Sequence, residues 1–110
     1  MVPSSQLGEL EQAILLAVLR LGDGAYGLAI REELAARTGR EVSHGAAYVT
    51  LDRLQAKGLV ESWLADPTPG RGGRRKRYFR LTAAGLEALR STREALFSLW
   101  AGLEDVLEDS

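Results

Sequence analysis

The sequence predicts a mainly α-helical fold with one small β-hairpin, an α+β domain of 110 residues. Apolar residues recur every three or four positions through the first half of the chain, which is the period of a helix. Two short segments rich in β-branched and aromatic residues then flank a loop of prolines and glycines. After residue 82 the helical period returns. A chain of this length and composition folds as one domain with its own core.

The first helix is indicated by five apolar residues that share one face. Residues 3–5, Pro-Ser-Ser, supply capping residues before it, and residues 22–24, Gly-Asp-Gly, stop it. The apolar face consists of Leu7, Leu10, Ile14, Val18 and Leu21.

A second helix is expected from Tyr26 to Thr38. Ile30 and Leu34 lie one turn apart on it, and Gly39 follows its last residue. Glycine commonly ends a helix because it adopts the left-handed conformation without a Cβ penalty.

The third helix is expected from Ser43, a good N-cap, to about Lys57, with Gly58 closing it. At 100° per residue its side chains divide into two faces. The apolar face holds Ala47, Leu51 and Leu54. The opposite face holds Gly45, Tyr48, Val49, Asp52 and Arg53.

Residues 59–65 and 74–81 read as two strands of a hairpin. The segment between them, "DPTPGRGG", is a loop because its prolines and glycines cannot extend a ladder. Three short helices followed by a hairpin are the layout of a winged helix-turn-helix. This layout predicts a DNA-binding domain over residues 1–81, with its wing at about residues 66–74.

The last helix begins after Thr82 and is expected to reach about Glu108, so that residues 82–110 form a dimerisation helix. Such a helix would be about 40 Å long at 1.5 Å per residue, which is more than a small domain covers alone. A partner chain is the simplest cover. The repeating positions are Leu86, Leu89, Arg93, Leu96, Trp100, Leu103 and Leu107.

Positive charge is concentrated in residues 71–80, although the chain has a net charge of −1. Acidic residues gather at 104–109, so the small net charge hides a polarised molecule. On a wing, arginines would meet a duplex backbone, because the guanidinium donates bidentate hydrogen bonds to phosphate. A solvated hairpin edge is the alternative. The basic residues are Arg71, Arg74, Arg75, Lys76, Arg77 and Arg80.

DNA contacts are expected from the third helix and the wing. Asp52 repels phosphate, so it either accepts from a cytosine amino group or pairs with a nearby arginine. His44 either contacts the backbone or a base, or is a solvated neighbour of the cap, and Tyr48 is otherwise a rim aromatic beside the wing. The predicted DNA-binding residues are Ser43, His44, Gly45, Tyr48, Thr50, Arg53, Arg71, Arg74, Arg75, Lys76 and Arg77.

The segments "SHGAAYVTLDRLQAKGLVES" and "GRGGRRKRYFRLTAAGLEAL" resemble the PadR family of bacterial winged-helix transcriptional regulators, in its short subgroup with a single C-terminal helix. The resemblance covers about residues 7–103. It implies a homodimeric repressor on an inverted repeat, with the third helix in the major groove, Tyr48 near a phosphate and the wing at the flanking minor groove. Leu28 and Asp52 depart from the family pattern, which often has an aromatic and a basic or neutral residue there.

Dimerisation is expected through the first and last helices. Trp100, with Phe97 nearby, is either a dimer-core anchor or, as in relatives that stack planar drugs, part of an effector site. Trp63 is expected to pack in the core or on the hairpin rather than to line a ligand site. The predicted dimerisation residues are Leu7, Leu10, Ile14, Leu89, Leu96, Trp100, Leu103 and Leu107.

Other function classes find little support. There is no cysteine and only one histidine, and no metal-ligand spacing, catalytic constellation or cofactor motif is present, so neither an enzyme nor a bound metal is expected. No apolar run is long enough to cross a membrane, and we expect a cytoplasmic protein. A winged helix used for protein–protein contact remains an alternative. So does an RNA-binding protein, from the single "RGG" at residues 71–73.

Overall fold

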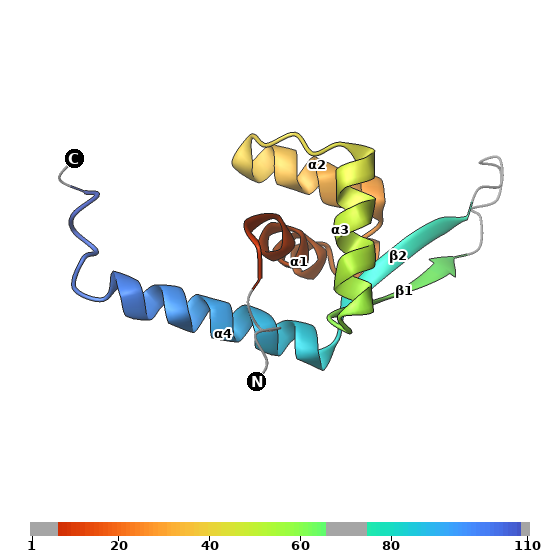
Figure 1. The fold of residues 1–110 in the computed structure, drawn as a ribbon. Helices are drawn as coiled ribbons and strands as arrows, with labels where there is room; N and C mark the ends of the chain where they lie inside the picture. Colours follow the sequence, from red (N-terminus) through yellow and green to blue (C-terminus); the bar gives the residue numbers. More distant parts are fainter. Residues whose placement is uncertain (1–6, 66–74, 109–110) are drawn as a thin grey trace.

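The computed structural model describes residues 7–65 and 75–108. Within these ranges it confirms the mainly α, α+β fold (Figure 1). The elements are α1 (Glu9–Leu21), a 3-10 turn η2 (Gly22–Gly24), α2 (Gly27–Thr38), α3 (His44–Ala56), β1 (Val60–Ala65), β2 (Lys76–Leu81) and α4 (Ala83–Trp100).

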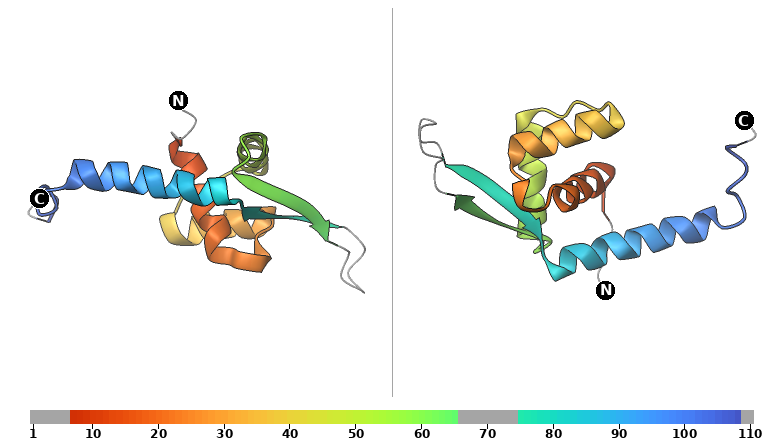
Figure 2. Two further views of the ribbon diagram at one scale, coloured as in Figure 1. Left: turned by 90° about the horizontal axis from the view of Figure 1, so that it is seen from below. Right: turned by 180° about the vertical axis from the view of Figure 1, so that it is seen from behind.

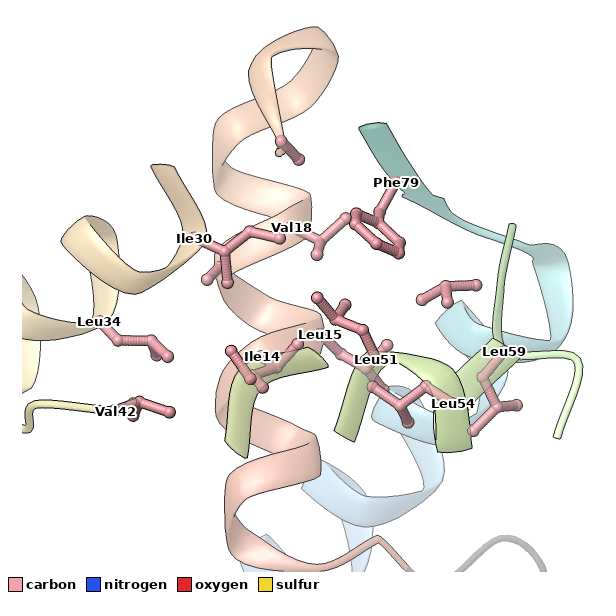
Figure 3. Close-up of a cluster of buried hydrophobic side chains, with 14 of the residues drawn as sticks. Ile14, Leu15, Val18, Ile30, Leu34, Val42, Leu51, Leu54, Leu59 and Phe79 are labelled. Carbon is pink, nitrogen blue, oxygen red and sulfur yellow. The ribbon is translucent and has the colours of Figure 1, made fainter. Parts of the chain in front are cut away.

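The core lies where α1, α2, α3 and β2 meet. Ile30 of α2, Leu51 of α3 and Phe79 of β2 converge on the residues of α1, and none of the three is exposed (Figure 3). Burying an apolar side chain of this size contributes about 1.5–3 kcal/mol relative to leaving it in water. These contacts hold α3 against the domain by its inner face only.

Capping residues confirm the predicted limits of α2, α3 and the start of α4. Ser43 Oγ accepts from the Ala46 N–H at 3.0 Å, and Thr82 Oγ1 accepts from the Gly85 N–H at 3.1 Å. Gly39 and Gly58 follow α2 and α3 with φ of 73° and 79°. Such local signals lie in adjacent residues, so a sequence shows them directly.

The start of α1 differs from the prediction. Residues 3–5 were expected to cap it, but they lie outside the described residues and Gly8 is the N-cap. The Gly8 N–H donates to Glu11 Oε1 at 2.9 Å. The Glu11 carboxylate thus reaches back to the N-cap N–H, as the third residue of a capping box does, while Gly8 has no side chain with which to cap the N–H groups of the first turn.

The hairpin is antiparallel, with Val60 opposite Leu81 and Ala65 opposite Lys76. The Phe79 N–H donates to the Ala25 carbonyl oxygen at 2.9 Å, which ties β2 to the connection between α1 and α2. The predicted wing, residues 66–74, lies outside the described part of the chain.

The last helix is shorter than predicted, because α4 ends at Trp100 and not near Glu108. Ala101 is extended and Gly102 has a φ of 85°. The apolar repeat continues beyond this point, but the backbone conformation does not. Figure 2 shows α4 running away from the other helices. Every residue from 93 to 108 is exposed.

Candidate nucleic-acid interface

The two predicted faces of α3 are confirmed. Ala47, Leu51 and Leu54 have no exposed surface. The opposite side is open to solvent, and Val49 on it is 57% exposed. A Cβ atom on Gly45 would point into open space. The exposed residues on this side are Gly45, Val49, Asp52, Arg53 and Ala56.

Thr50 is not on this exposed surface, and its predicted DNA contact is wrong. It is 4% exposed, and its hydroxyl donates to the Ala46 carbonyl oxygen at 2.8 Å. Residues three or four apart are neighbours on a helix, so Thr50 lies beside the buried Ala47 and Leu54, at the edge of the buried face. A threonine can be buried there because the preceding turn of the helix accepts its proton.

Tyr48 is half-buried at the side of α3 that faces the start of α2. Its ring lies 4.6 Å from the exposed His44 ring and 6.3 Å from the Phe79 ring, measured between centroids. Its hydroxyl has no hydrogen-bond partner in the described chain, where no buried polar side-chain atom is left unpaired. The hydroxyl therefore reaches solvent and is free to donate.

Arg77 connects the hairpin to α3. Its guanidinium donates to Asp52 Oδ1 at 3.2 Å and to Gln55 Oε1 at 2.7 Å, and its Nε donates to Ser62 Oγ at 3.1 Å. The guanidinium also lies 4.9 Å from the centre of the Phe79 ring. The predicted pairing of Asp52 with an arginine is confirmed. Sequence reasoning missed Gln55, whose only signal is its place three residues after Asp52.

The described residues of the basic run lie on both faces of the hairpin and do not form one surface. Successive residues of a strand point to different faces, so Lys76 and Arg77 are on different faces of the hairpin. The Lys76 ammonium lies 4.2 Å from the centre of the Tyr26 ring. Arg80 is on the Lys76 side, where it pairs with Glu61. Arg75 is exposed and has no partner in the described chain. Arg71 and Arg74 lie outside the described residues.

An aromatic layer covers the outer face of the hairpin. Trp63 stacks on Tyr78 with centroids 6.1 Å apart, and Tyr78 meets the edge of Tyr26 at 5.5 Å. Arg80 lies 5.3 Å from the Trp63 ring. The expectation that Trp63 packs on the hairpin is confirmed.

A second ion pair fixes the C-terminal end of α3 to α1. Lys57 Nζ donates to Glu11 Oε2 at 2.8 Å, and Glu11 is buried. Burial alone would raise the pKa of Glu11. The hydrogen bonds from Lys57 and Gly8, with the charges of Lys57 and Arg53, outweigh burial and hold that pKa below its ordinary value of 4.5.

An apolar groove of about 370 Å³ lies between α1 and α4. Leu16 and Leu19, which are 48% and 50% exposed, line it beside Leu89 and Leu96. The sequence reading missed Leu16 and Leu19 because they lie off the face that it chose for α1. Their spacing of three residues was the available signal.

The other predicted dimerisation residues have mixed positions. Ile14 has no exposed surface, so its prediction is wrong: it belongs to the core of one chain. Leu7 and Leu10 are half-buried against that core. Trp100, Leu103 and Leu107 are exposed.

The predicted effector residues are also on the surface. Phe97 is 64% exposed and Trp100 is 40% exposed. The Arg93 guanidinium lies 5.9 Å from the centre of the Phe97 ring.

Two further findings concern only residues 7–65 and 75–108. No group of three or more histidine, aspartate or glutamate side chains is placed to hold a metal ion there. None of the helices in these ranges is long and apolar enough to cross a membrane.

Comparisons with known proteins confirm the family resemblance. The model of the transcriptional regulator PadR-like family matches residues 15–91. Transcriptional regulator Rv3488 of Mycobacterium tuberculosis is 41% identical over 76 residues, which are 67% of this chain and 64% of that protein.

Solved structures agree. The crystal structure of a PadR-like transcriptional regulator from Bacillus cereus is 26% identical, with a TM-score of 0.70 over 89% of this chain and 90% of that one. The complex structure of hsRosR-S1 is 29% identical, with a TM-score of 0.71 over 98% of this chain and 95% of that one. The chain belongs to the PadR family of transcriptional regulators and is a DNA-binding regulator with a winged helix-turn-helix fold.

Proposed function

We propose that this regulator is a homodimeric repressor that binds an inverted-repeat operator. The observation that carries the proposal is the uncovered apolar surface along α1 and α4. A monomer would leave this surface in water, and exposed apolar patches of this kind mark interaction sites. A two-fold dimer covers it with the same surface of a second copy. The surface consists of Leu16, Leu19, Leu86, Leu96, Phe97, Leu99 and Trp100.

The arrangement of α4 supports this dimer. Only Gly85 and Ala88 of α4 are buried, so just its first turns pack on the domain. The remainder extends from the body as an arm (Figure 1). In the proposed dimer each arm lies along the groove of the partner, with Leu89 and Leu96 against Leu16 and Leu19. Residues 82–110 are then the dimerisation segment.

The exposed face of α3 is proposed to enter the major groove. Gly45 and Ala46 allow the backbone to approach the bases closely, and Val49 offers an apolar contact for a thymine methyl group. Arg53 and the Tyr48 hydroxyl are donors for phosphates at the groove edges. A two-fold axis presents two such helices, which predicts half-sites about one helical turn apart.

The hairpin is proposed to follow the flanking minor groove. Arg75 is exposed and has no partner within residues 7–65 and 75–108, so its charge is available to a phosphate. Arg77 is partly neutralised by Asp52 and orients the hairpin more than it binds DNA. The contributions of Arg71 and Arg74 would add to that of Arg75.

Release from the operator is proposed to follow binding of a planar aromatic compound between the arms. Trp100 and Phe97 are exposed on α4, and a two-fold axis brings in a second pair. Aromatic rings bind planar ligands by offset stacking. A ligand between the arms would change the separation of the two α3 helices.

Sedimentation velocity tests the dimer, with Leu16→Glu and Leu96→Glu as interface variants. Leu28→Glu is the matched control, because Leu28 is also about half exposed but lies outside the groove. We expect dimers for wild type and control, and monomers for the interface variants. A monomeric wild type would contradict the proposal. In-vitro transcription from a promoter that contains the bound site tests repression.

A further inference from the structure

Gly27 is the first residue of α2 and is buried. Its φ is not positive, so the backbone there does not require glycine. Glycine also weakens a helix relative to alanine, because it loses more conformational freedom on folding. The presence of glycine at this position therefore needs a reason outside the backbone of α2.

That reason is the side chain of Tyr48. A Cβ atom on Gly27 would lie 2.7 Å from Cε2 and Cζ of Tyr48, and closer still to its Oη. Carbon atoms in contact are about 3.5–4.0 Å apart. The phenol ring of Tyr48 thus occupies the space that a side chain at position 27 would need.

Two other aromatic rings border the Tyr48 ring. His44 lies against it at 4.6 Å and the edge of Phe79 meets it at 6.3 Å, between centroids. A methyl group on Gly27 would push the ring outward, away from α2. The position of the Tyr48 hydroxyl on the surface is therefore set by residue 27, which belongs to another helix.

We infer that Gly27 is a positioning residue for DNA binding: it fixes the Tyr48 phenol at the height from which the hydroxyl donates to a backbone phosphate. This inference rests on the proposed placement of α3 against DNA. Gly27 has no side chain with which to contact DNA. The three atoms nearest to a Cβ at this position all belong to Tyr48, so variants of Tyr48 separate this effect from a general effect on the fold.

A double-mutant cycle tests the inference, with the DNA dissociation constant and the thermal midpoint as readouts. Gly27→Ala and Tyr48→Phe should each raise the dissociation constant about tenfold, as for one lost hydrogen bond to a charged group. The salt dependence of binding should not change, because a neutral hydroxyl releases no counterion. Gly24→Ala is the matched control, because its Cβ would meet no atom within 4 Å.

The Tyr48→Ala background completes the cycle. There the space is empty, so Gly27→Ala should leave the dissociation constant unchanged and raise the thermal midpoint. If Gly27→Ala alone fails to fold but folds in this background, the steric relationship is supported by that result.

The outcomes separate the inference from the proposed function. If Tyr48→Phe weakens binding and Gly27→Ala does not, the inference is wrong and the placement of α3 stands. If Gly27→Ala weakens binding equally with and without the Tyr48 ring, its effect is on α2 and the inference is again wrong. If neither variant changes binding, the placement of Tyr48 at a phosphate is wrong and the inference falls with it.

Discussion

Arg77 of β2 pairs with Asp52 of α3 at 3.2 Å, so the hairpin and the DNA-facing helix share one ion pair. The pair places a carboxylate on the exposed face of α3, which we propose to meet phosphate, and its partner guanidinium is also held by Gln55 and Ser62. Both charged groups remain partly exposed, so their net contribution to stability is small. We therefore expect the main effect of Asp52 to be on DNA affinity.

Asp52→Asn should lower the DNA dissociation constant about threefold, because it removes one repulsive charge in a largely aqueous setting. The free energy of unfolding should change by less than about 1 kcal/mol. Fluorescence anisotropy and urea unfolding measure the two quantities. Glu87→Gln, which removes an exposed charge on α4, is the control and should leave affinity unchanged. Weaker binding by Asp52→Asn would show that Asp52 contacts a base or orients Arg77.

The Glu11–Lys57 pair should make stability depend on pH. The pKa of Glu11 is lowered by folding, so its contribution is present above pH 4.5 and is lost as the pH falls below that value. Glu11→Gln should lower the free energy of unfolding at neutral pH by about 1–3 kcal/mol. The free energy of unfolding of this variant should also fall less steeply below pH 4.5 than that of the wild type. Urea unfolding from pH 3 to pH 7 measures this. Glu9→Gln, in the same turn but exposed, should keep the wild-type profile.

Two helical glycines should respond oppositely to alanine. A Cβ on Gly85 would overlap the Leu59 carbonyl oxygen and lie 3.1 Å from its carbon, so Gly85→Ala should destabilise by about 1–3 kcal/mol. Gly45 faces open space, and Gly45→Ala should stabilise by about 0.5–1 kcal/mol. Thermal unfolding measures both. If both substitutions changed the free energy of unfolding equally, Gly85 of α4 would not approach the Leu59 backbone this closely.

Alanine substitutions at Ile14 and Leu16 should distinguish a residue of the core from a residue of the proposed dimer interface. Ile14→Ala should lower the free energy of unfolding by about 2–5 kcal/mol at every protein concentration. Leu16→Ala should act through the dimer, so its effect should disappear on dilution. Chemical unfolding over a wide concentration range distinguishes the two. If the effect of Ile14→Ala disappeared on dilution, Ile14 would belong to the dimer interface and not to the core.

Features decided by adjacent residues could be predicted from the sequence. The caps at Ser43 and Thr82, the stops at Gly39 and Gly58 and the buried face of α3 follow from side chains within one turn of each other. The basic hairpin and the family were also accessible, because both depend on residue types in order along the chain.

Features decided by tertiary contacts could not be predicted from the sequence. Thr50 was placed with the donors by its polarity, but the fold buries it. Ile14 fits an interface pattern as well as a core pattern, and only the position of α2 and α3 separates them. The repeat beyond Trp100 continues in the sequence while the helix ends. The approach of Gly27 to Tyr48 joins two helices and has no local signal.

The most direct test of this account is DNA binding across a salt series. Fluorescence anisotropy would compare the duplex upstream of the protein's own gene with a shuffled duplex, using wild type, Arg75→Ala and the charge-matched control Arg37→Ala. Arg37 is in the last turn of α2, and the C-terminal end of α2 lies away from the hairpin (Figure 1).

We expect tight binding to the native duplex alone, weakened by Arg75→Ala and not by Arg37→Ala. For a dimer with about 6–10 phosphate contacts, affinity should fall by about 10³–10⁵ between 50 and 200 mM salt. Equal and weak binding of wild type to both duplexes would contradict the account, because it would leave only a basic surface without an operator.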